Sequence, residues 1–369
     1  MEKQRICIIG DGLSGLTTAI TLNNLNKAEV HLISDKTKKT LDKRTTAISD
    51  SNYKFLKENI NSIDNKLFWP SKNIKLFYEN RKSKVNFLNF KEEKNNLLYI
   101  FENYKYKKLL LKEFKKKKIK KIKKKIENLD QLKIYDLIIL CLGGESSLYD
   151  KIIDKRSLKK DYKEVAITGY VKHDIKNLST SQFFLKEGPI AILPFSKDSF
   201  SFVWSVNKTF YQTNLKNINN IIKNKIKNIL MIKKNIKLTN LQSFPIKMGL
   251  KRKYYKNNIL ILGEGLHTIH PVAGQGFNLT LRDIKKLKEV LNYYSKLGMS
   301  FNNSFALNDF CNQRRPENIL MGLGINATHK FFKQNNYLDP FKELILKNLD
   351  KNKVLKKISK LISNQGLTL

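Results

Sequence analysis

Cysteine is scarce in this sequence, which has 369 residues and only Cys7, Cys141 and Cys311. The three lie far apart and form no C-x-x-C pair, so the sequence offers neither a disulfide framework nor a cysteine-based zinc site. We expect no bound metal. A reducing, cytoplasmic environment fits this use of cysteine.

Long hydrophobic runs are also missing. No apolar stretch approaches the length of about 18 residues that a membrane-spanning helix needs. The first residues are polar and lead directly into a strand pattern, which is unlike a signal peptide. We therefore expect a cytoplasmic protein, and we expect any contact with the inner membrane to be peripheral.

Negative charge is in short supply, with 32 Asp and Glu residues against 71 Lys and Arg residues, a net charge of +39. Such an excess points to nucleic acid or an anionic membrane surface. Lys is spread through loops and helix faces, however, and Arg, which is preferred for base and phosphate contacts, is scarce. We interpret the charge as compositional bias, expect no nucleic-acid partner, and favour a solvated face over a phosphate or membrane patch for the basic residues 105–126.

A glycine-rich turn follows the first predicted strand. Residues 5–9 (RICII) and 29–33 (EVHLI) have the pattern of buried strands, with a helix pattern between them. The intervening G-x-G-x-x-G turn consists of Gly10, Asp11, Gly12, Leu13, Ser14 and Gly15. Glycine at these positions permits a tight turn, a close approach of the backbone to a pyrophosphate, and helix–strand contact. The segment predicts a dinucleotide-binding βαβ unit, and by itself leaves NAD and FAD open.

The acid expected at the end of the second strand, where it would bind the ribose hydroxyls, is displaced. Ser34 occupies that position and Asp35 follows it. Successive side chains of a strand point to opposite faces, so Asp35 reaches the ribose only if the strand end is irregular. Asp35 as the ribose ligand, and Ser34 in its place with Asp35 solvated, both stay open.

A second glycine-rich stretch lies at residues 259–282. Four apolar residues predict a short buried strand that ends at Gly263, and an irregular segment leads to Gly274 and Gly276. From Phe277 onward the apolar residues recur at helical spacing. The glycines therefore lie where the free N–H groups of a helix N-terminus gather, which favours negative charge on a ligand.

This second stretch resembles the second FAD signature of the group A flavin-dependent aromatic hydroxylases, and within them of the ubiquinone-biosynthesis hydroxylases. The matching residues are Gly263, Glu264, Gly265, Leu266, His267, Pro271, Gly274, Gln275, Gly276, Asn278 and Asp283. The run GPIAILP at residues 188–194 resembles a run of the same family. Arg44, in an R-x-x-A-I segment, matches a family position that reaches toward the flavin.

One segment departs from the family. Relatives carry A-D-G-x-x-S after the strand that we predict at residues 134–142, and their Asp helps to bind pyrophosphate. Here Gly143 and Gly144 follow Leu142, so that Asp is absent. The absence of this Asp bears on how the flavin is reduced, with NAD(P)H as the expected electron donor, more than on FAD binding itself.

The resemblance implies an α/β fold in which a Rossmann-like FAD-binding domain with a parallel sheet is interleaved with an antiparallel-sheet substrate domain. We predict the FAD-binding domain at residues 1–72, 100–160 and 245–300, the substrate domain at 73–99 and 161–244, and a helical C-terminal region at 301–369. Alternating strand patterns, a hairpin at residues 196–198 and a helix at 218–232 fit this division. We expect Phe195, Phe202 and Trp204 in the core rather than against substrate.

The resemblance also implies the site residues. The FAD contacts would be Gly10, Gly12, Leu13, Ser14, Gly15, Ser34, Asp35, Arg44, Gly263, Glu264, Pro271, Gly274, Gln275, Gly276, Phe277 and Asn278. We predict His270, Pro271 and Gln275 beside the reacting atoms, where His270 would polarise the phenol or the flavin hydroperoxide; a histidine merely hydrogen-bonded within the loop is the alternative. His267 is expected to be structural, and no partner is evident for His31, His173 or His329.

The function implied is an FAD-dependent monooxygenase that hydroxylates the ring of a polyprenylated phenol or quinol in ubiquinone biosynthesis through a flavin hydroperoxide. Alternatives are another flavin hydroxylase or reductase acting on an aromatic or isoprenoid lipid, and a flavoprotein scaffold without turnover. Other quinone-biosynthesis proteins are expected partners. After Pro340, apolar residues recur among many lysines; this pattern fits a basic amphipathic helix on an anionic bilayer and a helix packed on its own protein equally well.

Overall fold

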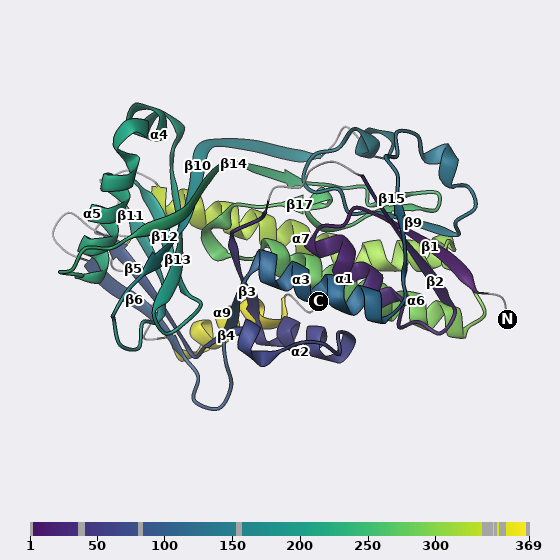
Figure 1. Ribbon diagram of the computed structural model, residues 1–369, viewed down its shortest axis with the longest axis horizontal. Coiled ribbons are helices and arrows are strands. Elements are labelled where there is room, and N and C mark those ends of the chain that lie inside the picture. The colour runs from purple at the N-terminus through teal and green to yellow at the C-terminus, as the bar shows by residue number, and fades with distance from the viewer. Residues whose placement is uncertain are drawn as a thin grey trace.

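Two large sheets lie beside each other in the computed structural model, which describes residues 3–35, 41–79, 84–152, 157–333, 342, 345–346 and 352–366. The mainly parallel sheet is at the right of Figure 1 and the mainly antiparallel sheet is at the left, with helix α7 (Ser304–Lys333) running between them. The predicted mixed α/β fold with a helical C-terminal part is confirmed.

The parallel sheet contains the first glycine turn. Its strands, in order across the sheet, are β15 (Tyr255–Lys256), β16 (Ile259–Ile261), β9 (Leu137–Leu140), β1 (Gln4–Ile9), β2 (Ala28–Ser34) and β8 (Lys120–Lys123). All neighbours pair in parallel except β15 and β16. The helices that accompany it are α1 (Leu13–Leu22), α3 (Asn103–Lys116) and α6 (Gly276–Lys296), and α1 packs against both others. Burial on both faces explains why β1 and β9 are continuous apolar runs.

The strand predicted at residues 134–142 is shorter than expected. β9 spans Leu137–Leu140, and Ile134 is 65% exposed. The chain before it is held by polar contacts, because Tyr135 hydrogen-bonds His31 and Asp136 accepts the backbone N–H of Arg5. Ile134, although apolar and close to the strand, therefore lies outside the core.

The second sheet has eight strands. In order they are β17 (His267–Thr268), β14 (Leu238–Leu250), β10 (Leu158–Lys172), β13 (Ser199–Asn207), β12 (Gly188–Pro194), β11 (Thr180–Leu185), β5 (Asn73–Glu79) and β6 (Lys84–Lys91). The pairing is antiparallel except between β11 and β5. The predicted hairpin joins β12 to β13.

One face of this sheet is covered by helices. Phe202 and Trp204 of β13 are fully buried in a cluster with Ile222 and Ile226 of α5 (Ile218–Leu230), and α4 (Lys208–Thr213) precedes that helix. These two aromatic residues lie in the core, as we expected. Because side chains alternate along a strand, Val203 between them faces the other way.

A small third sheet joins the two halves. It consists of β3 (Thr45–Ser49), β7 (Leu98–Glu102) and β4 (Trp69–Ser71), and α2 (Asp50–Asn59) follows β3. β7 therefore crosses the boundary that we predicted between residues 99 and 100, and it belongs to neither of the two large sheets. Short 3-10 turns complete the structure: Asn65–Leu67, Leu129–Leu132, Ser147–Lys151, Leu215–Asn217, Gly263–Gly265 and Pro271–Ala273.

The C-terminal part returns to the middle of the molecule. Helix α9 (Lys353–Gln365) packs against α2 and β3, so here the helix lies on its own protein. Leu344 and Leu349, which contributed to the predicted amphipathic pattern, lie outside the described residues. Among the helices described, none combines the length and the apolar character needed to cross a bilayer.

Candidate functional site

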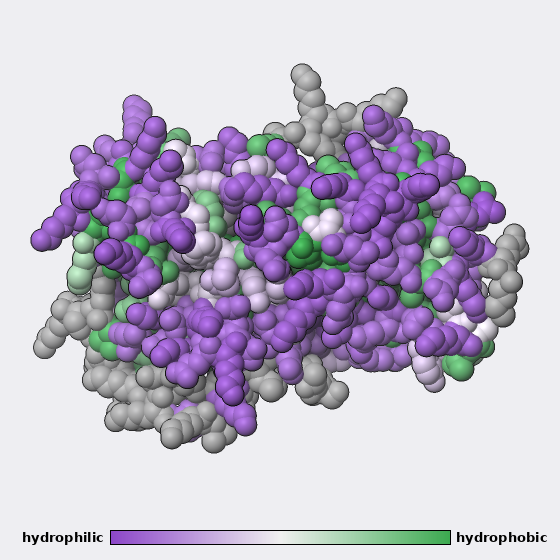
Figure 2. Space-filling view, turned by 60° about the horizontal axis from the view of Figure 1, so that its bottom comes forward, coloured by the Kyte–Doolittle hydropathy of each residue, from purple (hydrophilic) through white to green (hydrophobic). Residues whose placement is uncertain are grey.

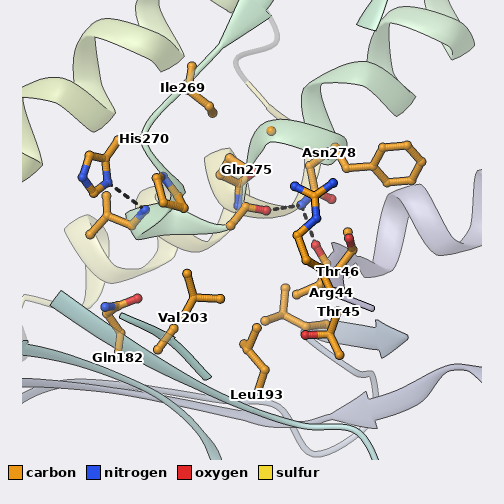
Figure 3. A pocket seen from close by; sticks show the side chains of 18 of the residues that line it. Arg44, Thr45, Thr46, Gln182, Leu193, Val203, Ile269, His270, Gln275 and Asn278 are labelled. Atoms are coloured by element: carbon orange, nitrogen blue, oxygen red, sulfur yellow. Dashed lines mark hydrogen bonds between the residues drawn. The ribbon is translucent and has the colours of Figure 1, made fainter. Parts of the chain in front are cut away.

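A cavity of about 740 Å³ lies where the two sheets and the small sheet meet. Its lining comes from the first glycine turn, from β3, from the loop between β17 and α6, and from the inner face of the eight-stranded sheet. Figure 3 shows Arg44, Thr45 and Thr46 on one side, the loop with Gln275 above, and Val203 and Leu193 rising from the sheet below. Two sequence motifs more than 200 residues apart thus border one space.

The first turn has the geometry that its glycines predict. Gly10 has a φ of +111°, and an added Cβ would lie 2.2 Å from the Cys141 carbonyl oxygen. A Cβ at Gly15 would lie 1.8 Å from the Gly10 carbonyl oxygen, so the helix can pack here only without a side chain. Gly12, by contrast, has open space beside it and lines the cavity with Leu13 and Ser14. A ligand can therefore approach the backbone at the start of α1.

Ser34 and Asp35 lie next to this turn but not on the cavity wall. Ser34 ends β2 and is buried, and the preceding residue, Ile33, accepts a hydrogen bond from the Gly10 N–H. Neither side chain is among those that line the cavity. Which of them contacts a ribose stays a prediction.

The structure adds two basic residues here that the sequence did not suggest. The ammonium of Lys121 on β8 lies 3.0 Å from a carboxylate oxygen of Asp11, and the ammonium of Lys107 on α3 lies 4.0 Å from the other. Burial lowers the pKa of both lysines, and for Lys107 the charge of Lys121 adds to this effect. They come from separate elements, so no local pattern could have placed them at the turn.

Arg44 reaches the cavity from the segment before β3. Its guanidinium donates to both carboxylate oxygens of Asp42, each at 2.8 Å, and lies over the Phe244 ring. Burial alone would raise the pKa of Asp42, but its hydrogen bonds with Arg44 and Asn103 lower it overall. Arg44 is thus held rigidly, and Asp42 is a neighbour that the sequence reasoning missed. Glu264, also on the cavity wall, attracts the same guanidinium and further favours its charged form.

The second glycine motif forms the loop above the cavity. Gly274 has a φ of +60°, and α6 begins at Gly276 without a side-chain cap among the described residues. Gly274, Gln275, Gly276 and Phe277 all line the cavity together with Pro271. The amide oxygen of Gln275 is buried and has no hydrogen-bond partner. The uncapped helix N-terminus favours negative charge on a ligand. The unpaired amide oxygen of Gln275 favours a ligand that carries an N–H donor.

Asn278 fastens this loop to the small sheet. Its side-chain nitrogen donates to the carbonyl oxygens of Ala47 (3.0 Å) and Gly274 (3.1 Å), as Figure 3 shows. Its side-chain oxygen accepts from the Ser49 N–H at 2.9 Å and from the Asn52 amide at 2.7 Å. Asn278 was predicted to contact the cofactor, but every polar atom of its side chain is engaged within the protein.

His267 and Asp283 of the signature are structural, as expected for His267. The histidine Nε2 lies 2.6 Å from a carboxylate oxygen of Asp283, and the other oxygen accepts from the Arg314 Nε at 2.7 Å. Arg314 also pairs with Glu317, and all these side chains are buried. Burial would raise the pKa of Asp283, but Arg314 and His267 lower it. The network binds the loop and α6 to α7.

His270 lies at the edge of the cavity with its ring engaged elsewhere (Figure 3). The imidazole is fully buried; Nδ1 accepts from the Val272 N–H at 3.1 Å, and Nε2 lies 3.0 Å from Glu164. Because Nδ1 accepts, the proton of the neutral ring is on Nε2 and is donated to the carboxylate. Burial, more than any other cause, lowers the pKa of His270. With neither nitrogen free, the geometry favours the alternative of a histidine bonded within the protein over direct contact with a reacting group.

Glu164 of β10 has partners on the loop over the cavity and on α7. Besides His270 it accepts from His329 at 3.0 Å and from Lys333, both on α7. Burial would raise the pKa of Glu164, but these hydrogen bonds hold it well below its ordinary value. The ligand atoms of Glu164, His270 and His329 lie within 4.8 Å of one another, a spacing that a metal ion could use. The Lys333 ammonium and the proton on His270 Nε2 occupy the carboxylate instead, so we interpret the group as a hydrogen-bonded charge cluster.

Gly143 occupies the place of the acid found in relatives. It lines the cavity with a φ of +81°, and an added Cβ would meet nothing within 4 Å. The Tyr149 hydroxyl donates to its carbonyl oxygen at 2.8 Å. The missing carboxylate therefore leaves free space at this point of the wall.

Known proteins are similar to this chain in sequence and in fold. A family model described as an FAD binding domain matches residues 150–296. The ubiquinone biosynthesis monooxygenase COQ6 of Dictyostelium discoideum is 23% identical over 245 residues, which are 54% of this chain and 50% of that protein. The 3-demethoxyubiquinol 3-hydroxylase of Escherichia coli K12 is 30% identical over 93 residues, 25% of this chain and 24% of the relative. The chain thus matches at most about half the length of these relatives.

The fold is shared over nearly the whole chain. The crystal structure of p-nitrophenol 4-monooxygenase PnpA from Pseudomonas putida DLL-E4 superimposes with a TM-score of 0.78 over 98% of both chains, at 12% identity. The FAD-binding match lies on the segment that carries the second glycine motif, and the sequence relatives are ubiquinone-pathway monooxygenases. The chain is therefore similar in sequence to FAD-dependent hydroxylases, among them monooxygenases of ubiquinone biosynthesis, and shares the fold of a flavin-dependent monooxygenase.

Proposed function

We propose that this protein is an FAD-dependent monooxygenase that hydroxylates the ring of a polyprenylated phenol or quinol in ubiquinone biosynthesis. The observation that carries the proposal is that one cavity is bordered by a dinucleotide turn, by an uncapped helix N-terminus and by an apolar sheet face. The turn would bind the nucleotide, the helix N-terminus would lie against the flavin ring, and the sheet face would contact an apolar substrate.

The residues present fit FAD. The start of α1 at Gly12 would hold the pyrophosphate, and Arg44 would add positive charge beside it. The loop at Gly274 and Gly276 would lie against the flavin pyrimidine edge, where the orphaned Gln275 oxygen could accept from a ring N–H. Pro271, which has no N–H, would border the ring and stiffen the loop.

Bound and reduced, the flavin supplies the activation of O2 and the transfer of one oxygen atom to the substrate ring. The protein's part is to position and to exclude water. The α6 N-terminus stabilises negative charge near the flavin, and the apolar residues Leu76, Leu193 and Val203 keep the substrate side dry. NAD(P)H is the electron donor we propose.

The cavity wall also suits a prenyl tail. Ile74, Phe90, Leu97 and Leu98 add to the apolar lining of the cavity. The names of the relatives place them in ubiquinone biosynthesis, whose precursors carry such tails. A peripheral contact of the lysine-rich α9 region with membrane, and contact with other quinone-biosynthesis proteins, belong to the same proposal.

The test is stopped-flow mixing of the FAD-loaded, reduced protein with O2 in the presence of a prenylated phenol, followed by mass spectrometry of the products. We expect product with one added oxygen atom, formed faster than the flavin reoxidises without substrate. Protein that takes up no flavin, or that returns only hydrogen peroxide with every prenylated phenol, would contradict the proposal.

A flavoprotein without turnover is the second candidate, and Gly143 is the observation that favours it. The acid of relatives is missing there and nothing fills its place. In that case NADH and NADPH would both fail to bleach the flavin, although dithionite would reduce it. A flavin hydroxylase or reductase acting on another aromatic lipid would instead be reduced normally and would select a different ring.

A further inference from the structure

One row of residues crosses the sheet beneath the flavin loop. Register pairs Leu76 with Gln182, Gln182 with Ala191, Ala191 with Val203, and Val203 with Thr168. Residues paired in this way point to the same face, and all five line the cavity. The row is therefore the floor on which a substrate ring would lie.

Gln182 is the exception within this row. Three of the others are apolar, and the hydroxyl of Thr168 is already used, donating to the Phe202 carbonyl oxygen at 2.8 Å. Gln182 is 9% exposed, and its side-chain amide has no hydrogen bond with any described residue. In Figure 3 its amide points up from the sheet into the cavity, on the side of Val203.

The side-chain polar atoms of Gln182 are open to the cavity, so the amide loses its contact with water only when a ligand fills that space. Leaving a buried donor or acceptor without a partner costs about 1–3 kcal/mol. The amide is also held in a fixed position, because β11 lies between β5 and β12 in the sheet. Ala191 beside it has a small side chain, which leaves room for a flat group to reach the amide.

We propose that Gln182 orients the substrate by hydrogen-bonding an oxygen on its ring. This inference rests on the proposed function and adds to it a criterion by which the protein would distinguish between substrates. An amide both donates and accepts, so it can hydrogen-bond the hydroxyl of a phenol or quinol as well as the carbonyl of a quinone. Fixing one ring oxygen on the floor determines which ring carbon is turned toward the loop at Pro271 and Gln275. Gln182 thereby selects oxygen-bearing rings over plain prenylbenzenes.

The experiment measures binding separately from turnover. Wild-type FAD-loaded protein is titrated by calorimetry with a short-chain prenylphenol and with the prenylbenzene that lacks the hydroxyl. We expect the phenol to bind about tenfold more tightly or better, which is the worth of one buried hydrogen bond. In Gln182→Leu and in Gln182→Met, which keeps the side-chain length, we expect that preference to fall to about twofold or less.

Turnover gives the second readout. In the same variants we expect the product formed per donor consumed to fall, because the ring is no longer held, while absorbance shows that FAD is still bound. Gln212→Leu, an exposed glutamine on α4, is the matched control and should behave as wild type. A wild-type protein that binds both probes equally, or Gln182 variants that retain the preference, would overturn this inference. Failure of the wild type to take up FAD would instead overturn the proposed function.

Discussion

Asn278 shows how one side chain can join two walls of a cavity. Its side chain forms four hydrogen bonds, to Ala47, Ser49, Asn52 and Gly274. The amide thereby sets the distance between the loop over the cavity and β3, which carries the other wall. The width of the cavity at this point depends on that distance.

Asn278→Ala should lower the free energy of unfolding by about 2–4 kcal/mol, because it leaves several buried polar groups without partners. It should also weaken FAD binding. Urea unfolding and flavin titration measure the two effects, with the exposed Asn292→Ala on the same helix as the control. Equal behaviour of the two variants would show that the loop is held by other contacts.

The cluster around Glu164 predicts a pH dependence. The pKa of His270 lies below its ordinary value of 6.5, chiefly because of burial. As the pH drops through 6.5, this histidine takes up a proton in the unfolded chain but not yet in the folded chain. The free energy of unfolding therefore falls as the pH drops, and the contribution of His270 is fully retained only above this range. Glu164, with a lowered pKa, adds a further loss below its ordinary value of 4.5.

We expect wild-type stability to fall between about pH 7.5 and pH 5.5 and the fall to be smaller in His270→Gln, because the variant has no ring to protonate. Urea unfolding at several pH values measures the slope. Burial also lowers the pKa of His173, so His173→Gln is the comparison. A slope that changes in His173→Gln but not in His270→Gln would contradict this prediction.

Among the elements, α9 has the least expected position. Four of its described residues, Ser359, Lys360, Ser363 and Asn364, line the mouth of the cavity. The Asn364 side chain accepts from the Ser51 N–H at 3.0 Å, and the Asn364 carbonyl oxygen accepts from the Ser49 hydroxyl at 2.9 Å. The helix is thus fixed by its last turn to the start of α2.

Asn364→Ala should loosen this helix. We expect a loss of about 1 kcal/mol in the free energy of unfolding, the worth of one hydrogen bond, and faster proteolytic removal of the C-terminal segment. Limited proteolysis followed by mass spectrometry measures the second effect. Gln365→Ala, an exposed neighbour, should cleave at the wild-type rate, and the same rate in both variants would contradict a role for Asn364.

At the scale of the whole molecule, the two glycine motifs should respond together to FAD. A ligand that binds only the folded state raises stability, by about 2.7 kcal/mol at a concentration of 100 times its Kd. FMN lacks the adenosine half and cannot reach the turn at Gly12, so it should raise the melting temperature less than FAD at equal concentration. Scanning calorimetry with each flavin, and with ADP, tests this; equal shifts with FMN and FAD would mean that the first turn takes no part.

Most of the fold could be predicted from local patterns in the sequence. The turn at Gly10, the strands β1 and β2 and the start of α6 follow from glycine placement and apolar spacing within about twenty residues, a range in which sequence patterns are informative. Glu164 and Lys121 had no such signal, because their partners lie on other elements and the register of three sheets must be known first. Hydrophilic residues were also uninformative, since Figure 2 shows them over most of the visible face, interrupted by smaller hydrophobic areas, rather than gathered in one patch.

The loop over the cavity is tied on two sides: through His270 to Glu164 of β10, and through Asn278 to β3. β10 also carries Thr168, at the end of the row on which the substrate ring would rest. One strand therefore supports both the floor of the cavity and the loop above it. A change in the position of β10 would move both of these walls together.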